Sequence, residues 1–217
     1  FSKLLAKLEH YGINGKLLNF ISAFSHNRGQ SVVLENNCSS VADLLSGVPQ
    51  GSVLGPILFV VINDVSSVCI GKTNLKLFAD DVKLYTSFKI DESNCCSLQK
   101  SIDLLSSWTN AWQLAINISK CSVLPIRNRH NSSVSHPYFI NGTQLVQSTS
   151  VSDLGILVDS RLSFNLHISN ILTKATQRSG VFFRGFVSRQ FAFVRKTFIT
   201  YIRPLLDYNY NIWNPTK

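Results

Sequence analysis

Two adjacent carboxylates are the strongest chemical signal in the chain. Asp80 and Asp81 follow Phe78-Ala79, and the β-prone runs Leu75–Phe78 and Val82–Tyr85 on either side predict a strand–turn–strand bend at the two acids. Like charges held this close raise the pKa of at least one carboxyl unless a cation lies beside them. Magnesium prefers oxygen ligands and leaves coordination positions for substrate phosphates, which suits nucleotidyl transfer by two metal ions. For the tetrad alone, a solvated Asp-Asp turn is the alternative interpretation.

A loop rich in glycine and proline precedes the acidic pair. It runs from Gly47 to Pro56 and holds three glycines and two prolines around Gln50. Glycines let a backbone approach a ligand closely, and prolines stiffen the loop. Together with the acids, the loop could form a surface against a template and an incoming nucleotide. The alternative is a tight turn before a buried helix, which we expect from Ile57 to about Ser67.

Basic residues are concentrated towards the C-terminus. The net charge of the chain is +9, and residues 160–206 contain eight basic residues and no acid. Such a stretch attracts phosphate backbones, although a solvated helix face can have the same composition. The eight are Arg161, Lys174, Arg178, Arg184, Arg189, Arg195, Lys196 and Arg203.

Bulk composition limits the class of protein. Of the 217 residues, 45% are hydrophobic and 15% charged, so we expect a packed core rather than disorder. No apolar run is long enough to span a bilayer, and no signal-peptide pattern opens the chain. Five cysteines without C-x-x-C spacing predict reduced, mostly buried thiols in an intracellular compartment, without deciding between nucleus and cytoplasm. Because the chain starts at Phe1 and has no methionine, we expect a piece of a longer protein.

The elements that must position these residues change in type along the chain. Helices are expected around Leu4–Leu8, Leu17–Phe24 and Leu98–Trp112. Two hairpins are expected, one from Gln30–Glu35 and Val41–Leu45, and one from Tyr138–Ile140 and Thr143–Val146 across Asn141-Gly142. Further strands are expected at Ser122–Ile126 and Val151–Val158. After Ser163 the apolar spacing is helical, and Pro204 should end or bend the last helix. We therefore predict a mixed region over residues 1–159 and a helical region over residues 160–217.

Ordered motifs run along the whole chain. They are Lys3-Leu4-Leu5, Tyr11-Gly12-Ile13, Gly47–Pro56, Leu58-Phe59, Ile62-Asn63-Asp64, Phe78–Asp81, Trp108 with Leu114, Asn117, Lys120 and Cys121, Leu154-Gly155, Leu162-Ser163-Phe164 with His167, and Tyr201–Tyr208 before Trp213. This order resembles the reverse transcriptases of non-LTR (LINE-type) retrotransposons. A group II intron or telomerase-type polymerase fits less well, because Leu162–His167 and Arg203–Tyr208 are similar to the retrotransposon lineage.

The resemblance implies an α+β fold of the polymerase right-hand type. Residues 1–159 would be part of a palm, an antiparallel sheet with helices on one face, residues 160–217 would be a helical thumb, and the fingers would be absent. The implied activity is RNA-directed DNA polymerisation, with an RNA template, a DNA primer, deoxynucleoside triphosphates and two Mg²⁺ ions. No membrane partner is implied, and the oligomeric state is left open.

The resemblance also implies roles for single residues. Asp80 and Asp81 match the catalytic, metal-binding pair, and Lys120 matches a lysine that protonates pyrophosphate, with an ordinary surface lysine as the alternative. The template and nucleotide loop is matched by Gly47, Pro49, Gln50 and Gly51, and the hairpin that grips the primer is matched by Leu154 and Gly155. The contacts to the nucleic-acid backbone are matched by Arg161, Lys174, Arg178, Arg184, Arg189, Arg195 and Lys196. His167 is expected to pack or cap rather than to catalyse.

The chain departs from the family pattern at its start. The family supplies a further metal-binding aspartate from an earlier palm strand, and Phe1 falls at or after that strand. The acids before Gly47 are Glu9, Glu35 and Asp43, and none of them occupies the matching position. We therefore predict that this polypeptide alone has no polymerase activity. A non-catalytic retrotransposon remnant that at most binds nucleic acid is the alternative function.

Overall fold

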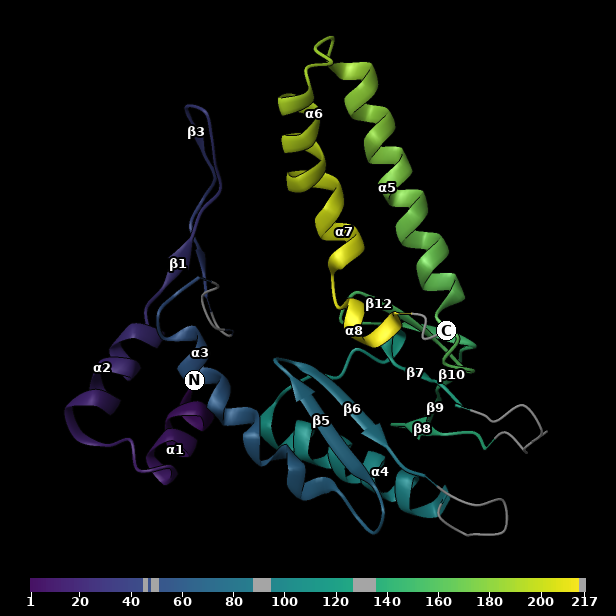
Figure 1. Ribbon diagram of the computed structural model, residues 1–217. Helices are drawn as coiled ribbons and strands as arrows, with labels where there is room; N and C mark the ends of the chain where they lie inside the picture. The colour runs from purple at the N-terminus through teal and green to yellow at the C-terminus, as the bar shows by residue number, and fades with distance from the viewer. Residues whose placement is uncertain (45–46, 48–50, 88–94, 127–135, 215–217) are drawn as a thin grey trace. The chain divides into compact units, whose positions relative to one another are not determined.

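The computed structural model of the protein describes residues 1–44, 47, 51–87, 95–126 and 136–214. The chain divides into two compact units, Phe1–Ile116 and Asn117–Lys217 (Figure 1). Both units combine helices with short strands, in agreement with the α+β class. This division falls earlier than residue 160. The boundary that we predicted at residue 160 is the one between a palm and a thumb, and that boundary stays a prediction.

The first unit begins with two helices at the predicted positions. Helix α1 (Ser2–His10) is followed by Gly12 at φ +88°, a left-handed conformation that suits glycine, and by α2 (Gly15–Ser25). Leu8 of α1 and Ile21 of α2 are almost completely buried, and they pack with Leu58 to form a small core. The apolar spacing in the sequence thus predicted these helices correctly.

A narrow β ribbon follows α2 and projects away from the two helices (Figure 1). The ribbon pairs β1 (Gly29–Gln30) with β4 (Ala42–Asp43) and, beyond them, β2 (Val33–Leu34) with β3 (Asn37–Cys38). The predicted hairpin is present, with a turn after Leu34 in which Glu35 has φ +51°. Its apolar side chains lie in solvent, because Val32, Val33, Leu34 and Val41 are each 68–72% exposed.

The helix after the glycine–proline loop differs from the prediction. A short α-helix, α3 (Gly55–Leu58), continues as a ten-residue 3₁₀ helix, η1 (Phe59–Val68). The expectation of one buried helix is wrong in part, since Phe59 is 40% exposed whereas Val65 and Val68 are buried. A 3₁₀ helix has three residues per turn, so positions 65 and 68 lie on the same side. That side faces the core of the unit.

In the rest of the first unit, a β-hairpin packs against helices. Strands β5 (Asn74–Phe78) and β6 (Asp81–Tyr85) are antiparallel, and α4 (Cys95–Trp112) follows them. Val65 and Val68 of η1 and Leu105 of α4 form the buried cluster beneath the hairpin, with half-buried side chains from both strands packed against it. The hairpin therefore has helices on one face.

The second unit begins with short strands. A 3₁₀ turn, η2 (Ile118–Lys120), leads to β7 (Ser122–Val123), which pairs in parallel with β10 (Val146–Gln147), and β8 (Phe139–Ile140) pairs with β9 (Thr143–Gln144) across Asn141-Gly142 as expected. The prediction of a single strand over Val151–Val158 is wrong. The chain instead folds back as β11 (Ser150–Asp153) and β12 (Ile156–Asp159), because Leu154 and Gly155 both adopt positive φ.

Helices dominate after Asp159. Helix α5 (Asn165–Gly185) lies beside a second helical column of opposite direction (Figure 1), formed by α6 (Phe191–Thr197), the π-helix η3 (Phe198–Ile202) and α7 (Arg203–Asp207), and α8 (Tyr210–Trp213) follows. Pro204 does not end the column, since it lies in the first turn of α7, where a missing N–H costs little. The π-helix η3, directly before α7, accommodates the backbone hydrogen bond that Pro204 cannot donate.

Strand pairing in the described residues is local. The strands form six two-stranded sheets, and no wider sheet occurs among the described residues. The right-hand arrangement of palm and thumb, with the fingers absent, therefore stays a prediction. None of the described helices is long and apolar enough to cross a membrane.

The cysteines are less buried than the sequence suggested. Among the described thiols, Cys38 and Cys96 are exposed, Cys69 and Cys121 are half-buried, and none forms a disulfide. The prediction of mostly buried thiols is wrong for these four. Cys38 lies in β3 of the exposed ribbon, and Cys96 is an exposed residue of the first turn of α4, so neither is buried in a core.

Candidate functional site

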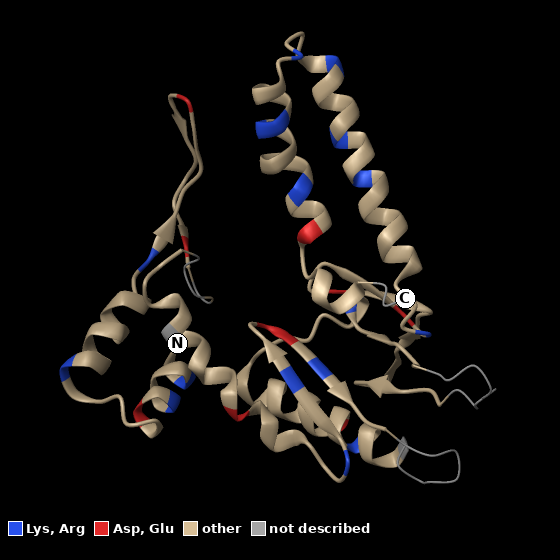
Figure 2. Cartoon of the chain, in the orientation of Figure 1, with Lys and Arg blue, Asp and Glu red and all other residues tan. Residues whose placement is uncertain are grey.

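The acidic pair lies at the end of the β5–β6 hairpin. Phe78 pairs with Asp81, so Ala79 and Asp80 are the two turn residues, and Ala79 has φ +51°. Both carboxylates are exposed. The charges appear as the red tip of this hairpin in Figure 2. The predicted bend at the acids is confirmed, with Asp81 already in the second strand.

The sequence of the hairpin explains why the acids face solvent. Alternating residues of β5, Leu75 and Leu77, are half-buried against η1 and α4, and Leu84 of β6 joins them. A side-chain period of two places the intervening residues on the opposite face, where Phe78 is 62% exposed. The leucines thus fix the register, and the carboxylates are held at the outer end of an anchored hairpin.

The glycine–proline loop is described only in part. Pro49 and Gln50 lie outside the described residues, so their predicted role is untested. Gly47 and Gly51 are exposed, with φ +90° and +77°, and a Cβ added at either would meet no atom within 4 Å. Open space in front of a glycine backbone leaves room for a ligand to approach. Ser52 Oγ accepts the N–H of Gly55 at 3.1 Å and so holds the start of α3.

The carboxylate oxygens of Asp80 and Asp81 are ligands that magnesium prefers. Within the described part of the chain, no group of three or more His, Cys, Asp or Glu side chains is gathered closely enough to hold a metal ion. The donor chemistry therefore fits magnesium, and the set is two carboxylates rather than three.

Lys120 is the last residue of η2 and is exposed. It belongs to the second unit, whereas the acidic pair belongs to the first. A role for Lys120 at the pyrophosphate therefore stays a prediction. Its neighbour Cys121 is half-buried, and burial raises the pKa of that thiol.

The predicted primer-grip residues form the turn between β11 and β12. Leu154 has φ +46° and Gly155 has φ +83°. Tyr208 Oη donates a hydrogen bond to the Leu154 carbonyl at 2.8 Å, and a Cβ on Gly155 would approach Tyr208 Cε1 to 3.2 Å. The tyrosine ring therefore lies directly on the turn. Sequence reasoning placed Tyr208 in a family motif and assigned it no role.

His167 is buried at the base of α5, which confirms the expected packing role. Its Nδ1 accepts the Leu157 N–H at 3.2 Å, and its ring meets that of Trp213 edge-on, with 5.5 Å between centroids. Burial, and secondarily the charge of Lys174, lower the pKa of His167. The imidazole is therefore kept neutral, as an acceptor at Nδ1 requires.

Asp159 is a further residue that the sequence did not single out. Its Oδ1 accepts the N–H of Arg161 at 2.8 Å and of Ser163 at 3.1 Å, and its Oδ2 accepts the Ser163 hydroxyl. These hydrogen bonds, those from Ser163 above all, lower the pKa of Asp159. The only available signal was an Asp four residues before Ser163 at a strand end, typical of a side-chain-capped turn.

The predicted backbone-binding cations are all exposed. Five of them lie on α5 and α6, which carry blue segments in Figure 2, while Arg161 precedes α5 and Arg189 lies between the two helices. Three of them also bond to helix carbonyls: Arg178 to Tyr201 at 3.0 Å, Arg184 to Gly180 at 3.1 Å, and Arg189 to Phe183 at 2.6 Å and to Phe186. Within the described residues, Arg161, Lys174, Arg195 and Lys196 have no such side-chain partner. These four are the cations freest to meet a phosphate.

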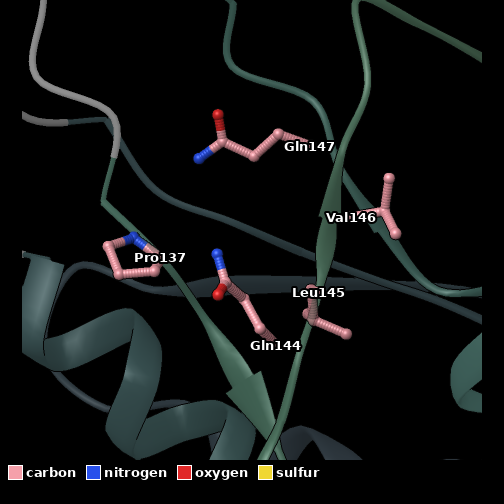
Figure 3. Close-up of a pocket in the computed structure, with 5 residues that line it drawn as sticks. All are labelled: Pro137, Gln144, Leu145, Val146 and Gln147. Atoms are coloured by element: carbon pink, nitrogen blue, oxygen red, sulfur yellow. The ribbon is translucent and has the colours of Figure 1, made fainter.

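A shallow hollow of about 700 Å³ lies beside strands β9 and β10 and is lined by Pro137, Gln144, Leu145, Val146 and Gln147. Figure 3 shows the two glutamine side chains extending towards Pro137. The Gln147 amide donates to the His136 carbonyl at 3.1 Å. Among the described residues that line the hollow, none is charged and none is a predicted site residue.

Comparison with known proteins gives a consistent result. Residues 1–158 match the family described as reverse transcriptase (RNA-dependent DNA polymerase). The chain is 30% identical over 168 residues to a protein of Drosophila funebris named RNA-directed DNA polymerase from mobile element jockey, covering 73% of this chain and 18% of that protein. No solved structure matches the chain.

Two further relatives come from Drosophila melanogaster. The probable RNA-directed DNA polymerase from transposon BS is 28% identical over 227 residues, covering 97% of this chain and 24% of that protein. The probable RNA-directed DNA polymerase from transposon X-element is 29% identical over 160 residues, covering 71% of this chain and 17% of that protein. The chain thus spans less than a quarter of the length of these curated relatives.

Proposed function

The chain belongs to the reverse transcriptase (RNA-dependent DNA polymerase) family, and from this premise we propose that it is the palm-and-thumb portion of a retrotransposon RNA-directed DNA polymerase. In this proposal residues 1–159 are part of the palm and residues 160–217 the thumb. The substrates are an RNA template, a DNA primer and deoxynucleoside triphosphates. The relatives named after mobile elements support the retrotransposon origin.

The observation that carries the proposal is the exposed acidic pair on an anchored hairpin. Asp80 and Asp81 supply carboxylate oxygens to magnesium, while the leucines beneath them keep the hairpin from moving away. When bound, the metal ions would activate the primer 3′-hydroxyl and neutralise charge on the leaving pyrophosphate. Gly47 and Gly51 leave space in which a template or nucleotide can lie close to the backbone.

The remaining residues act on nucleic acid and product. Lys120 delivers a proton to pyrophosphate, and the Leu154–Gly155 turn contacts the primer end. Backbone phosphates are contacted by four cations whose side chains have no partner among the described residues: Arg161, Lys174, Arg195 and Lys196. Arg178, Arg184 and Arg189 contribute charge while bonded to helix carbonyls. Two carboxylates hold two magnesium ions poorly, so residues 1–217 alone bind duplex and do not extend primers.

Primer extension on a primed RNA template tests this function. Residues 1–217 alone should give no extension, and a longer polypeptide that adds the preceding palm strand with its carboxylate should be active. In that polypeptide Asp80→Asn should lower the rate roughly a thousandfold, since metal catalysis supplies several kcal/mol.

The matched control is Asp103→Asn on the exposed side of α4, where asparagine can still accept the hydrogen bond from Gln99. Equal activity of the Asp80→Asn and Asp103→Asn polypeptides would overturn the catalytic assignment. An inactive longer polypeptide that still binds duplex would favour the non-catalytic remnant.

A further inference from the structure

The β11–β12 turn has a conformation that needs outside support. The pairing of Asp153 with Ile156 leaves only Leu154 and Gly155 to reverse the chain, both at positive φ. A left-handed leucine is strained, and such residues persist only where their surroundings hold them. Leu154 is also 36% exposed, so its own packing cannot supply that support. The restraint must come from elsewhere in the unit.

Tyr208 supplies a restraint on both turn residues. Its hydroxyl donates to the Leu154 carbonyl at 2.8 Å, across 54 positions in sequence. The edge of its ring lies so close to Gly155 that an added Cβ would come within 3.2 Å of Cε1. The turn is thus fixed in position by the hydroxyl and covered on one side by the ring.

Tyr208 is itself held by Trp213, which is held in turn by His167. Trp213 Nε1 donates to the Tyr208 carbonyl at 2.8 Å, and the Trp213 ring packs on His167, which accepts the Leu157 N–H on β12. The contacts form a closed circuit that starts and ends on the hairpin. A closed circuit of directional contacts restrains the turn more than the single tyrosine bond would.

We propose that Tyr208 is a positioning residue for the primer terminus, acting through the Leu154–Gly155 turn. The inference rests on the proposed function, in which this turn contacts the primer end. Extension requires the 3′-hydroxyl to lie within a few tenths of an ångström of its reacting position, and misplacement by about 1 Å costs on the order of 100-fold in rate. A turn that shifts would lose that alignment while leaving the phosphate contacts of α5 and α6 in place.

The test uses the 217-residue chain with Tyr208→Phe, which removes only the hydroxyl, and Tyr210→Phe as the matched control. Tyr210 is 52% exposed and has no side-chain hydrogen bond among the described residues. Trp213→Phe is the second variant, because it removes the donor that holds Tyr208. The first readout is amide exchange at residues 154–156, which should accelerate about fivefold to tenfold in both Tyr208→Phe and Trp213→Phe and stay unchanged in the control.

The second readout locates the primer end. A photoreactive 4-thiothymidine at the 3′-terminus of a DNA primer on RNA should crosslink mainly to the turn in the unaltered chain and in Tyr210→Phe. In Tyr208→Phe and Trp213→Phe the crosslinks should spread to neighbouring residues, while the Kd for the duplex stays within about twofold, since a neutral hydroxyl contributes little to phosphate binding.

Each outcome decides one claim. Faster exchange with an unchanged crosslink pattern would make Tyr208 a stabilising residue only and would overturn the inference. Exchange and crosslinks identical to those of Tyr210→Phe would also overturn it, with the proposed function intact. Absence of any duplex binding by the unaltered chain would instead reject the proposed function and the inference together.

Discussion

At the scale of single residues, Lys7 is a buried cation with three partners. Only 3% of its side chain is exposed, its Nζ donates to Asp64 at 2.6 Å, and it lies 4.8 Å and 3.9 Å from the ring centroids of Trp108 and Trp112. Lysine is buried in this way only when it is paired. The indole Nε1 of Trp108 has no hydrogen-bond partner among the described residues, so packing and the cation hold that ring.

Removing this cation should destabilise the first unit. Lys7→Ala should lower the free energy of unfolding by about 3 kcal/mol, because it deletes the buried partner of a half-exposed Asp64 and leaves a cavity beside two indoles. Denaturant unfolding followed by tryptophan fluorescence measures the change. Lys16→Ala, an exposed lysine of α2, is the control and should cost under about 0.5 kcal/mol. Equal losses in the two variants would refute the structural role.

His167 should make the second unit sensitive to mild acid. Its pKa in the folded state is lowered by burial and by Lys174, so the unfolded chain, with a pKa of about 6.5, binds the proton more readily. Stability is therefore full above about pH 6.5 and falls as the pH drops from there towards the folded pKa. His167→Gln should flatten this dependence in thermal unfolding at several pH values. Replacement of the exposed His136 by Gln should leave the pH dependence of thermal unfolding unchanged.

At the scale of elements, Asp159 fixes the junction between β12 and α5. Its carboxylate accepts from Arg161 and Ser163, on either side of Leu162 at φ +54°, just before α5 begins. Asp159→Ala should cost about 1–2 kcal/mol, as for a lost helix cap. Asp159→Asn, which keeps one acceptor oxygen, should cost less. A smaller loss for alanine than for asparagine in denaturant unfolding would contradict this assignment.

The Asp159 carboxylate also makes the stability of this junction depend on pH in the acid range. Because hydrogen bonds lower its pKa below the ordinary value, its contribution to stability is present above about pH 3.9 and is lost as the pH falls through the lowered pKa. This window lies below that of His167. The two titrations can therefore be separated in a single pH series.

The elements also show how far the sequence could be interpreted. Helices α1, α2 and α4 and the β5–β6 hairpin followed from apolar spacing, because their buried residues repeat with the period of the element. The β11–β12 hairpin could not be predicted by pattern, since Ser150–Asp159 is bent at a leucine, which rarely adopts positive φ. The resemblance to a family, rather than propensity, pointed to a hairpin there.

The candidate site, like the fold, could be predicted only in part from the sequence. Asp80 and Asp81 were identified because the acidic pair follows a glycine–proline loop within an ordered series of family motifs, and the structure places the pair at the predicted bend. Tyr208 could not be assigned a role, because its partner Leu154 lies 54 residues away and only the folded chain shows the contact. Contacts of this kind leave no periodic trace in a sequence.

At the scale of the whole molecule, the net charge of +9 should produce salt-sensitive binding to an RNA–DNA duplex. The double variant Lys174→Gln with Arg195→Gln should reduce the slope of log Kobs against log salt by roughly 2, one for each phosphate that is no longer neutralised. The control is Lys16→Gln with Lys100→Gln, which removes the same charge from the first unit. Fluorescence anisotropy at four salt concentrations distinguishes them, and equal slopes would remove α5 and α6 from the interface.

The ribbon of β1 to β4 has a practical consequence for any study of the polypeptide. Two-stranded pairing leaves both outer edges open, and the valines and leucine along it are mostly in solvent. Edges of this kind recruit strands from other molecules, so turbidity should rise with concentration and with salt as charge repulsion is screened. Val33→Lys should raise the protein and salt concentrations at which turbidity appears, without altering the helical circular-dichroism signal. A variant with this charged ribbon would then be the better starting material for crystallisation.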